Sequence, residues 1–140
     1  MKAPITIENY HYKGFHGNDC FCPIHIWPEQ NLVIAEHSEK ASPSPQQMVE
    51  SIAEDVIQKH KLNLKKLIWV DYVPAFCYSR PVDKFVSVNF EVNKPIFNSS
   101  LEFIASSTTF DSIKKEALED FITGNIFLQS KQKVNLTLGV

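Results

Sequence analysis

Six residues of types that commonly bind metals lie between positions 11 and 37: His11, His16, Cys20, Cys22, His25 and His37. A structural zinc site needs three or four converging ligands, and its cysteines are usually separated by two to four residues. Cys20 and Cys22 are separated by one. Alternate residues of a strand share a face, so both thiols point with Ile24 toward the core while His25 points away. The spacing therefore favours core thiols and surface histidines, and it leaves four candidate metal ligands: Cys20, Cys22, His16 and His25.

A third thiol, Cys77, lies in an aromatic segment that also contains Arg80. The thiolate is the nucleophilic form, and a neighbouring guanidinium lowers the pKa of a thiol. Catalysis by Cys77 would also need a base, for which His37 or His60 is available in the sequence. No recognised catalytic signature surrounds this cysteine, so a packed loop cysteine is the simpler interpretation.

Two carboxylates, Glu36 and Asp71, stand on otherwise apolar strands. If these strands were neighbours, the two carboxylates could lie close together, and the pKa of one would rise into a range useful for acid–base catalysis. An acidic side chain at a strand end that faces solvent or pairs with Arg80 explains the same pattern. Glu36 and Asp71 join Cys77 as the candidate catalytic residues.

Two groups of side chains suggest contact with a partner. The connection after position 73 combines Phe76, Tyr78, Arg80 and Pro81, and binding hot spots favour Tyr, Trp and Arg. The strand with Phe21, His25 and Trp27 contains Pro23, which cannot donate to a ladder hydrogen bond, so we expect this strand at the sheet edge or at a bulge. The binding residues that we expect are Phe76, Tyr78, Arg80 and Trp27.

The composition excludes several classes of protein. A length of 140 residues indicates one domain, and 44% hydrophobic residues are enough for a core. A net charge of -2 with Arg80 as the one arginine argues against nucleic-acid binding. No apolar run approaches the roughly 18 residues of a membrane span, and the first residues lack a signal-peptide pattern. Three cysteines do not suggest a disulfide framework, and the glycines at 14 and 17 lack phosphate-loop spacing. We therefore expect a cytoplasmic protein without cofactor, membrane or nucleic-acid partner.

The elements that must position these residues follow from hydrophobic periodicity. Alternation and apolar runs predict strands over 5–12, 20–27, 32–37, 67–73 and 85–92. Ser44 and Pro45 are typical of a helix start, and an apolar stripe continues to about Lys61. A second helix is expected from Thr108 or Asp111 to Thr123, whereas the Ser/Thr-rich residues 98–108 are expected to be a loop.

This element order predicts an α+β fold: a mostly antiparallel sheet of about five to six strands with two helices on one face. The first helix would join its flanking strands as a right-handed parallel crossover. Residues 1–124 are expected to form a single domain. Residues 125–140 are expected to be a C-terminal tail or an added strand.

Three segments resemble a group of short uncharacterised bacterial proteins. The segments are CFCPIHIW at 20–27, LVIAE at 32–36 and LIWVDYVP at 67–74. The group has a C-x-C…I-W strand, a V-I-A-T-E strand and, after a helix, an L-V-W-I-E-H-Y-P strand. Here Asp71 stands at the acidic position, Tyr72 follows it directly and the intervening histidine is absent. The resemblance implies a bacterial, cytoplasmic protein and carries no known activity.

The sequence therefore predicts a small binding or interaction module, acting as a homodimer or an adaptor subunit through a protein partner or self-association. The alternative is a hydrolase or metal-dependent enzyme that uses Cys77, Asp71 and nearby histidines.

Overall fold

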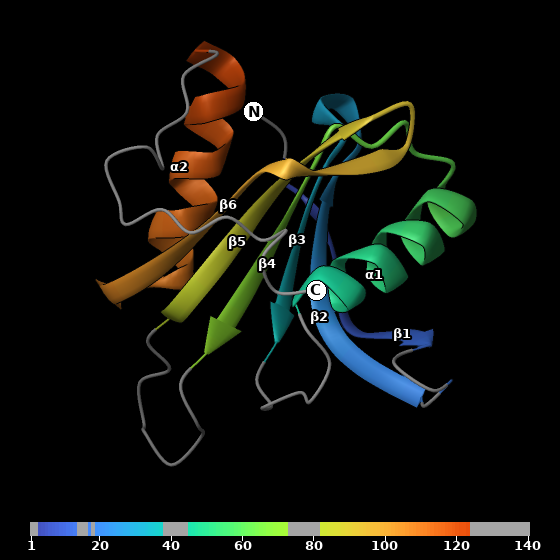
Figure 1. Cartoon of the computed structure of the whole chain (residues 1–140), viewed down its shortest axis with the longest axis horizontal. Coiled ribbons are helices and arrows are strands. Elements are labelled where there is room, and N and C mark those ends of the chain that lie inside the picture. Colours follow the sequence, from blue (N-terminus) through green and yellow to red (C-terminus); the bar gives the residue numbers. More distant parts are fainter. Residues whose placement is uncertain (1–2, 14–16, 18, 38–44, 73–81, 124–140) are drawn as a thin grey trace.

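The computed structural model describes residues 3–13, 17, 19–37, 45–72 and 82–123, which form a six-stranded sheet with two helices. The strands lie side by side in the order in which they occur in the chain (Figure 1). Their bounds are β1 Ile5–Lys13, β2 Asp19–Trp27, β3 Leu32–His37, β4 Lys66–Tyr72, β5 Val82–Glu91 and β6 Lys94–Thr108. Helix α1 (Pro45–His60) joins β3 to β4, α2 (Phe110–Thr123) follows β6, and a 3-10 turn, η2 (Pro28–Gln30), joins β2 to β3.

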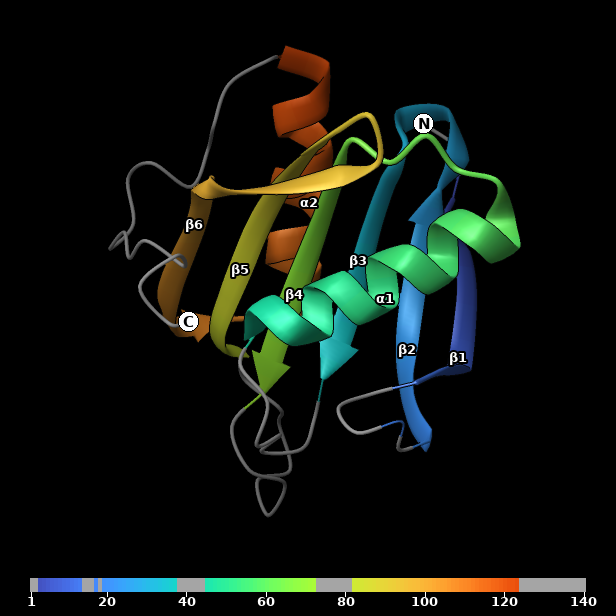
Figure 2. The same cartoon turned by 45° about the vertical axis from the view of Figure 1, so that its right-hand side comes forward.

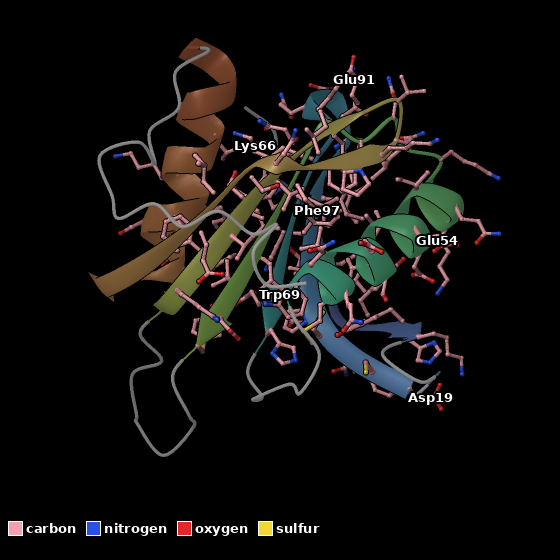
Figure 3. All side chains as sticks on the ribbon, in the orientation of Figure 1. Asp19, Glu54, Lys66, Trp69, Glu91 and Phe97 are labelled. Atoms are coloured by element: carbon pink, nitrogen blue, oxygen red, sulfur yellow. The ribbon has the colours of Figure 1, made fainter. Side chains whose placement is uncertain are left out.

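The α+β class and the parallel crossover are confirmed. Strands β3 and β4 pair in parallel, and the other four neighbouring pairs are antiparallel. Helix α1 begins at Pro45, whose fixed φ suits the first helical turn. Its apolar stripe, including Val49, Ile52 and Val56, packs on the sheet face that carries Trp69 (Figure 3).

The prediction that both helices cover one face is wrong. Figure 2 shows α1 in front of the sheet and α2 behind it. Ile113 of α2 is buried against Ile34, Ile68 and Phe85, none of which belongs to the core under α1. Strands β3 and β4 are apolar along both faces, so each face needs a covering layer.

Of the two alternatives predicted for residues 20–27, the edge strand is wrong, since β2 lies between β1 and β3, whereas the bulge agrees with the register shift between β1 and β2. Pro23 is tolerated there because β1 has a bulge between Ile7 and Tyr10 opposite this position. The pairing of β2 with β3 begins only at Ile24. No ladder hydrogen bond is therefore lost at the proline.

Residues 98–108, expected to be a loop, belong to β6. This strand follows β5 through a two-residue turn at Val92 and Asn93, whose φ angles are 51° and 59°. Residues 125–140 lie outside the described part of the chain. Neither of the two described helices is long and apolar enough to cross a bilayer.

Candidate functional site

A line of polar side chains crosses four neighbouring strands on the face that α2 covers. Thr6 of β1 contacts His25 of β2, with 2.9 Å between Thr6 Oγ1 and His25 Nδ1. His25 Nε2 lies 2.5 Å from Glu36 Oε2 on β3, and the Tyr72 hydroxyl of β4 donates to Glu36 Oε1. We call these four residues the polar line. It is a continuous path of hydrogen bonds from an exposed hydroxyl to a mostly buried carboxylate.

The positions in this line follow from strand register. Thr6 is the direct cross-strand partner of His25. Glu36 lies two residues beyond Ile34, which is the partner of His25 on β3. Side chains two residues apart on a strand share a face, so the ring of His25 reaches both neighbours.

Apolar rings shield the middle of the polar line. The Phe110 ring of α2 lies 4.9 Å from the His25 ring, and the Trp27 ring lies 6.5 Å from it, between centroids. The side chains of His25 and Glu36 are 10% and 16% exposed, whereas Thr6 is exposed. A hydrogen bond to a carboxylate gains strength in such a dry environment.

The network also fixes the tautomer of His25. Glu36, as a carboxylate, has only acceptor sites, so His25 donates from Nε2. The Nδ1 atom of a neutral imidazole is then an acceptor, and the Thr6 hydroxyl donates a hydrogen bond to it. The arrangement places a base beside an exposed hydroxyl and a carboxylate behind the base.

A second histidine–carboxylate pair lies on the opposite face. His37 and Asp71 are direct partners in the parallel ladder, with 3.5 Å between His37 Nδ1 and Asp71 Oδ1. The His37 ring stacks on the Trp69 ring at a centroid distance of 4.7 Å. The pair lies where β3 and β4 end, beneath the layer that contains α1.

The expected closeness of Glu36 and Asp71 does not occur. Their strands are neighbours, but Glu36 is the partner of Val70 while Asp71 is the partner of His37. A shift of one residue along a strand reverses the face, so the two carboxylates lie on opposite sides of the sheet. Each carboxylate contacts a histidine instead: Glu36 contacts His25, and Asp71 contacts His37.

The prediction of core thiols is confirmed, whereas the prediction of surface histidines is wrong for His25 and His37, which are both buried. Cys22 is buried in the core under α1, and Cys20 packs at the margin of this core. Burial, helped by the charge of Glu36 and by Cys20, raises the pKa of the Cys22 thiol to about 12. His25 points to the other face, and no group of three or more potential ligands gathers among the described residues. His16 lies outside the described residues.

The predicted contact residues are only partly described. Phe76, Cys77, Tyr78 and Arg80 fall in 73–81, outside the described residues. Trp27 is 2% exposed and packs in the core under α2, so it does not form an exposed contact in this fold. It was expected to be exposed because β2 was expected at the edge.

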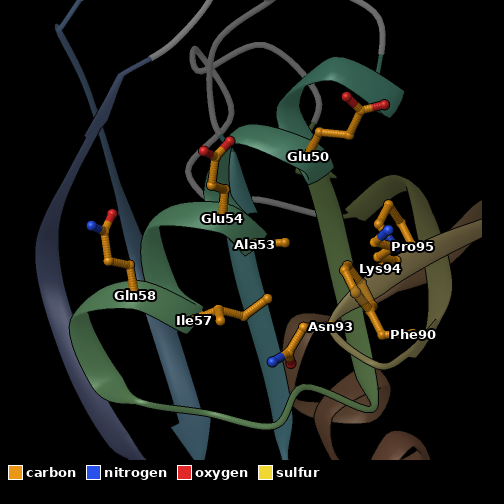
Figure 4. Close-up of a pocket in the computed structure, with 9 residues that line it drawn as sticks. All are labelled: Glu50, Ala53, Glu54, Ile57, Gln58, Phe90, Asn93, Lys94 and Pro95. Atoms are coloured by element: carbon orange, nitrogen blue, oxygen red, sulfur yellow. The ribbon is translucent and has the colours of Figure 1, made fainter.

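A groove of about 720 Å³ lies between α1 and the β5–β6 hairpin (Figure 4). Its apolar part consists of Ala53, Ile57, Phe90 and Pro95. Its polar part consists of Glu50, Glu54 and Gln58 of α1 and of Asn93 and Lys94 of the hairpin. The hairpin is fixed against the body of the domain, because Asn93 Oδ1 accepts from the backbone N–H of Leu64 at 2.8 Å.

Sequence reasoning missed Thr6 and Tyr72 as members of a site and missed the groove. Thr6 occupies a polar position of the first strand, and Tyr72 directly follows Asp71. Their roles depend on strand order, because hydrogen bonds between β1 and β2 and between β3 and β4 bring them to His25 and Glu36. Comparison with protein-family models, with curated proteins and with solved structures found no match to this chain.

Proposed function

We propose that the protein is a small binding domain that holds a segment of a protein partner in the groove between α1 and the β5–β6 hairpin. The supporting observation is an exposed apolar residue in a strained conformation at the rim of this groove. Val92, at the tip of the hairpin, is 80% exposed and has a φ of 51°. It directly precedes Asn93, Lys94 and Pro95, which line the groove.

The left-handed conformation of Val92 needs a physical explanation. A left-handed conformation costs an ordinary L-residue roughly 1–2 kcal/mol, and valine is branched at Cβ. Strained backbone persists where the surrounding structure maintains it, and it gathers at binding sites. The exposed side chain of Val92 also offers an apolar surface that a partner could cover.

The charges of the groove indicate the chemistry of the partner. Glu50 and Glu54 are exposed on the α1 side, next to an apolar floor formed by Ala53, Ile57 and Phe90. Lys94 is the cation on the opposite side. A partner segment in which Lys or Arg alternates with apolar side chains would place its cations beside the two glutamates and its apolar groups on the floor.

The test uses two fluorescent peptides of equal length, one alternating Lys with Leu and one alternating Glu with Leu. We expect the Lys peptide to bind, with amide chemical-shift changes confined to residues 50–58 and 90–95. Exposed charge pairs contribute about 0.2–1 kcal/mol each, so reversing both charges in Glu50→Lys, Glu54→Lys should weaken binding about tenfold. Glu8→Lys, at an exposed position of β1 outside the groove, is the matched control and should bind like the unmodified protein.

Two results would contradict this proposal. Equal binding of the Glu peptide would remove the role assigned to Glu50 and Glu54. A dimer that dissociates in the charge-reversed variant, seen by sedimentation across a dilution series, would make a second copy the occupant of the groove instead of a partner segment.

The segment at 74–83 remains a second proposed contact. Phe76, Tyr78 and Arg80 have the composition of a hot spot, and they follow β4 directly in the chain. A Phe76→Ala, Arg80→Ala variant that keeps its fold, its mass in solution and its partners would remove this contact. We also propose that the protein works in the cytoplasm.

A further inference from the structure

We propose that the protein also hydrolyses carboxylic esters of short apolar acyl groups, with Thr6 as nucleophile, His25 as base and Glu36 as the residue that positions His25. This inference does not depend on the groove. It rests on the polar line, where a hydroxyl, an imidazole and a carboxylate follow one another at 2.9 Å and 2.5 Å. An activated nucleophile has this signature: a base within hydrogen-bond reach and a third group that orients the base.

The direction of the hydrogen bonds suits proton transfer. Glu36 accepts from Nε2 of His25, which leaves Nδ1 as the acceptor for the Thr6 hydroxyl. The carboxylate stabilises the imidazolium that forms when His25 takes that proton. Tyr72, which also donates to Glu36, helps to hold the carboxylate in place.

The exposure of Thr6 and His25 also suits the roles of nucleophile and base. Thr6 is exposed, so an acyl carbon can approach its oxygen from solvent. The side chain of His25 is 10% exposed, and the Phe110 ring lies 4.9 Å from its ring. The base is thus held in one orientation while the nucleophile stays reachable.

A hollow that includes Trp27, whose ring lies 6.5 Å from the His25 ring, indicates the substrate class. The hollow has a volume of about 320 Å³ and is lined mainly by apolar groups, which include Ile5 and Trp27. This size suits a short acyl chain. The Nε1 atom of Trp27 is buried and donates to no described residue, so an acyl oxygen that reached it would satisfy a costly unpaired donor.

The reaction balances with water as the second reactant. Thr6 Oγ1 attacks the acyl carbon while its proton moves to His25 Nδ1. The bond from the acyl carbon to the leaving oxygen then breaks, and that oxygen takes the proton from His25 Nδ1, which leaves an ester on Thr6. Water attacks this ester and gives a proton to His25, and Thr6 Oγ1 recovers that proton when the carboxylic acid leaves.

The test measures release of p-nitrophenol from p-nitrophenyl acetate by the full chain, followed by mass mapping of acid-quenched protein. We expect saturable turnover and one acetyl group on the peptide that contains Thr6. Thr6→Val keeps the shape of the side chain and should lower kcat by at least about a hundredfold, whereas Thr6→Ser should retain activity. Ser51→Ala removes a hydroxyl from α1, on the opposite side of the sheet, and should have no effect.

Glu36 is tested by a readout that a purely structural role would not move. In Glu36→Gln, we expect kcat to fall with KM unchanged, together with a shift in the pH dependence of kcat. Full turnover by Thr6→Val would overturn the proposal. Acetylation of His25 or of a cysteine without acetylation of Thr6 would also overturn it, because the nucleophile would then be another group.

Discussion

The strained tip of the β5–β6 hairpin leads to a quantitative prediction for Val92→Asn. Both turn residues have positive φ, and turns of this kind favour Asn and Gly. Val92 bears a left-handed cost of roughly 1–2 kcal/mol, most of which Asn avoids. Full burial of a valine side chain contributes roughly 1.5–3 kcal/mol to stability. Val92 is 80% exposed, so the substitution loses only about one-fifth of this contribution. The free energy of unfolding should therefore rise by about 1 kcal/mol.

The assay is urea unfolding followed by tryptophan fluorescence, since Trp27 and Trp69 are both almost fully buried. A gain of this size corresponds to a rise in Tm of about 4 °C for a domain of this length. Val92→Thr is the matched control, because it keeps the branched Cβ and should give no gain. If Val92→Asn is no more stable than Val92→Thr, the positive φ angle of Val92 does not carry the free-energy cost that we assign to it.

Two further predictions concern single side chains. Lys61 follows α1 with a φ of 55°, so Lys61→Gly should raise the free energy of unfolding by about 0.5–1 kcal/mol in the same assay, while Lys61→Ala should not. The pKa of the Cys22 thiol rises from the ordinary 9.0 to about 12 in the folded protein. The folded state therefore holds this proton more tightly, and its stabilising effect is complete below about pH 9 and lost between about pH 9 and pH 12. Cys22→Ala should flatten this alkaline fall in stability, and an unchanged slope would contradict the buried-thiol interpretation. The pKa of Tyr10 is also raised, mainly by burial, and it adds a fall of the same sign.

Local patterns were sufficient for most elements of the fold. The strand at Leu32–His37 and the helix start at Pro45 follow from alternation and from a proline at the first helical turn. Residues 98–108 were misassigned because Ser and Thr are common both in loops and in strands, and only pairing with β5 decides between them. The opposite placement of α2 depends on which sheet face remains uncovered, and that is a property of the assembled sheet.

The candidate sites show the same difference between features that local patterns predict and features that depend on the assembled sheet. The burial of Cys22 and the placement of His25 on the opposite face of the sheet followed from alternation within one strand. The polar line needed the order of four strands and the register of each pair, which the chain does not display locally. Glu36 was identified as a candidate, but its expected partner, Asp71, lies on the other face because the register places Asp71 opposite His37.

The agreement of strand order with chain order has a consequence for how the protein folds. Each strand pairs with the one made just before it, so every sheet contact except that between β3 and β4 closes a short loop. Short loops close at low entropic cost and favour fast folding. We expect the β1–β3 meander to pair while later residues are still being synthesised, and the parallel step through α1 to set the folding rate of the domain.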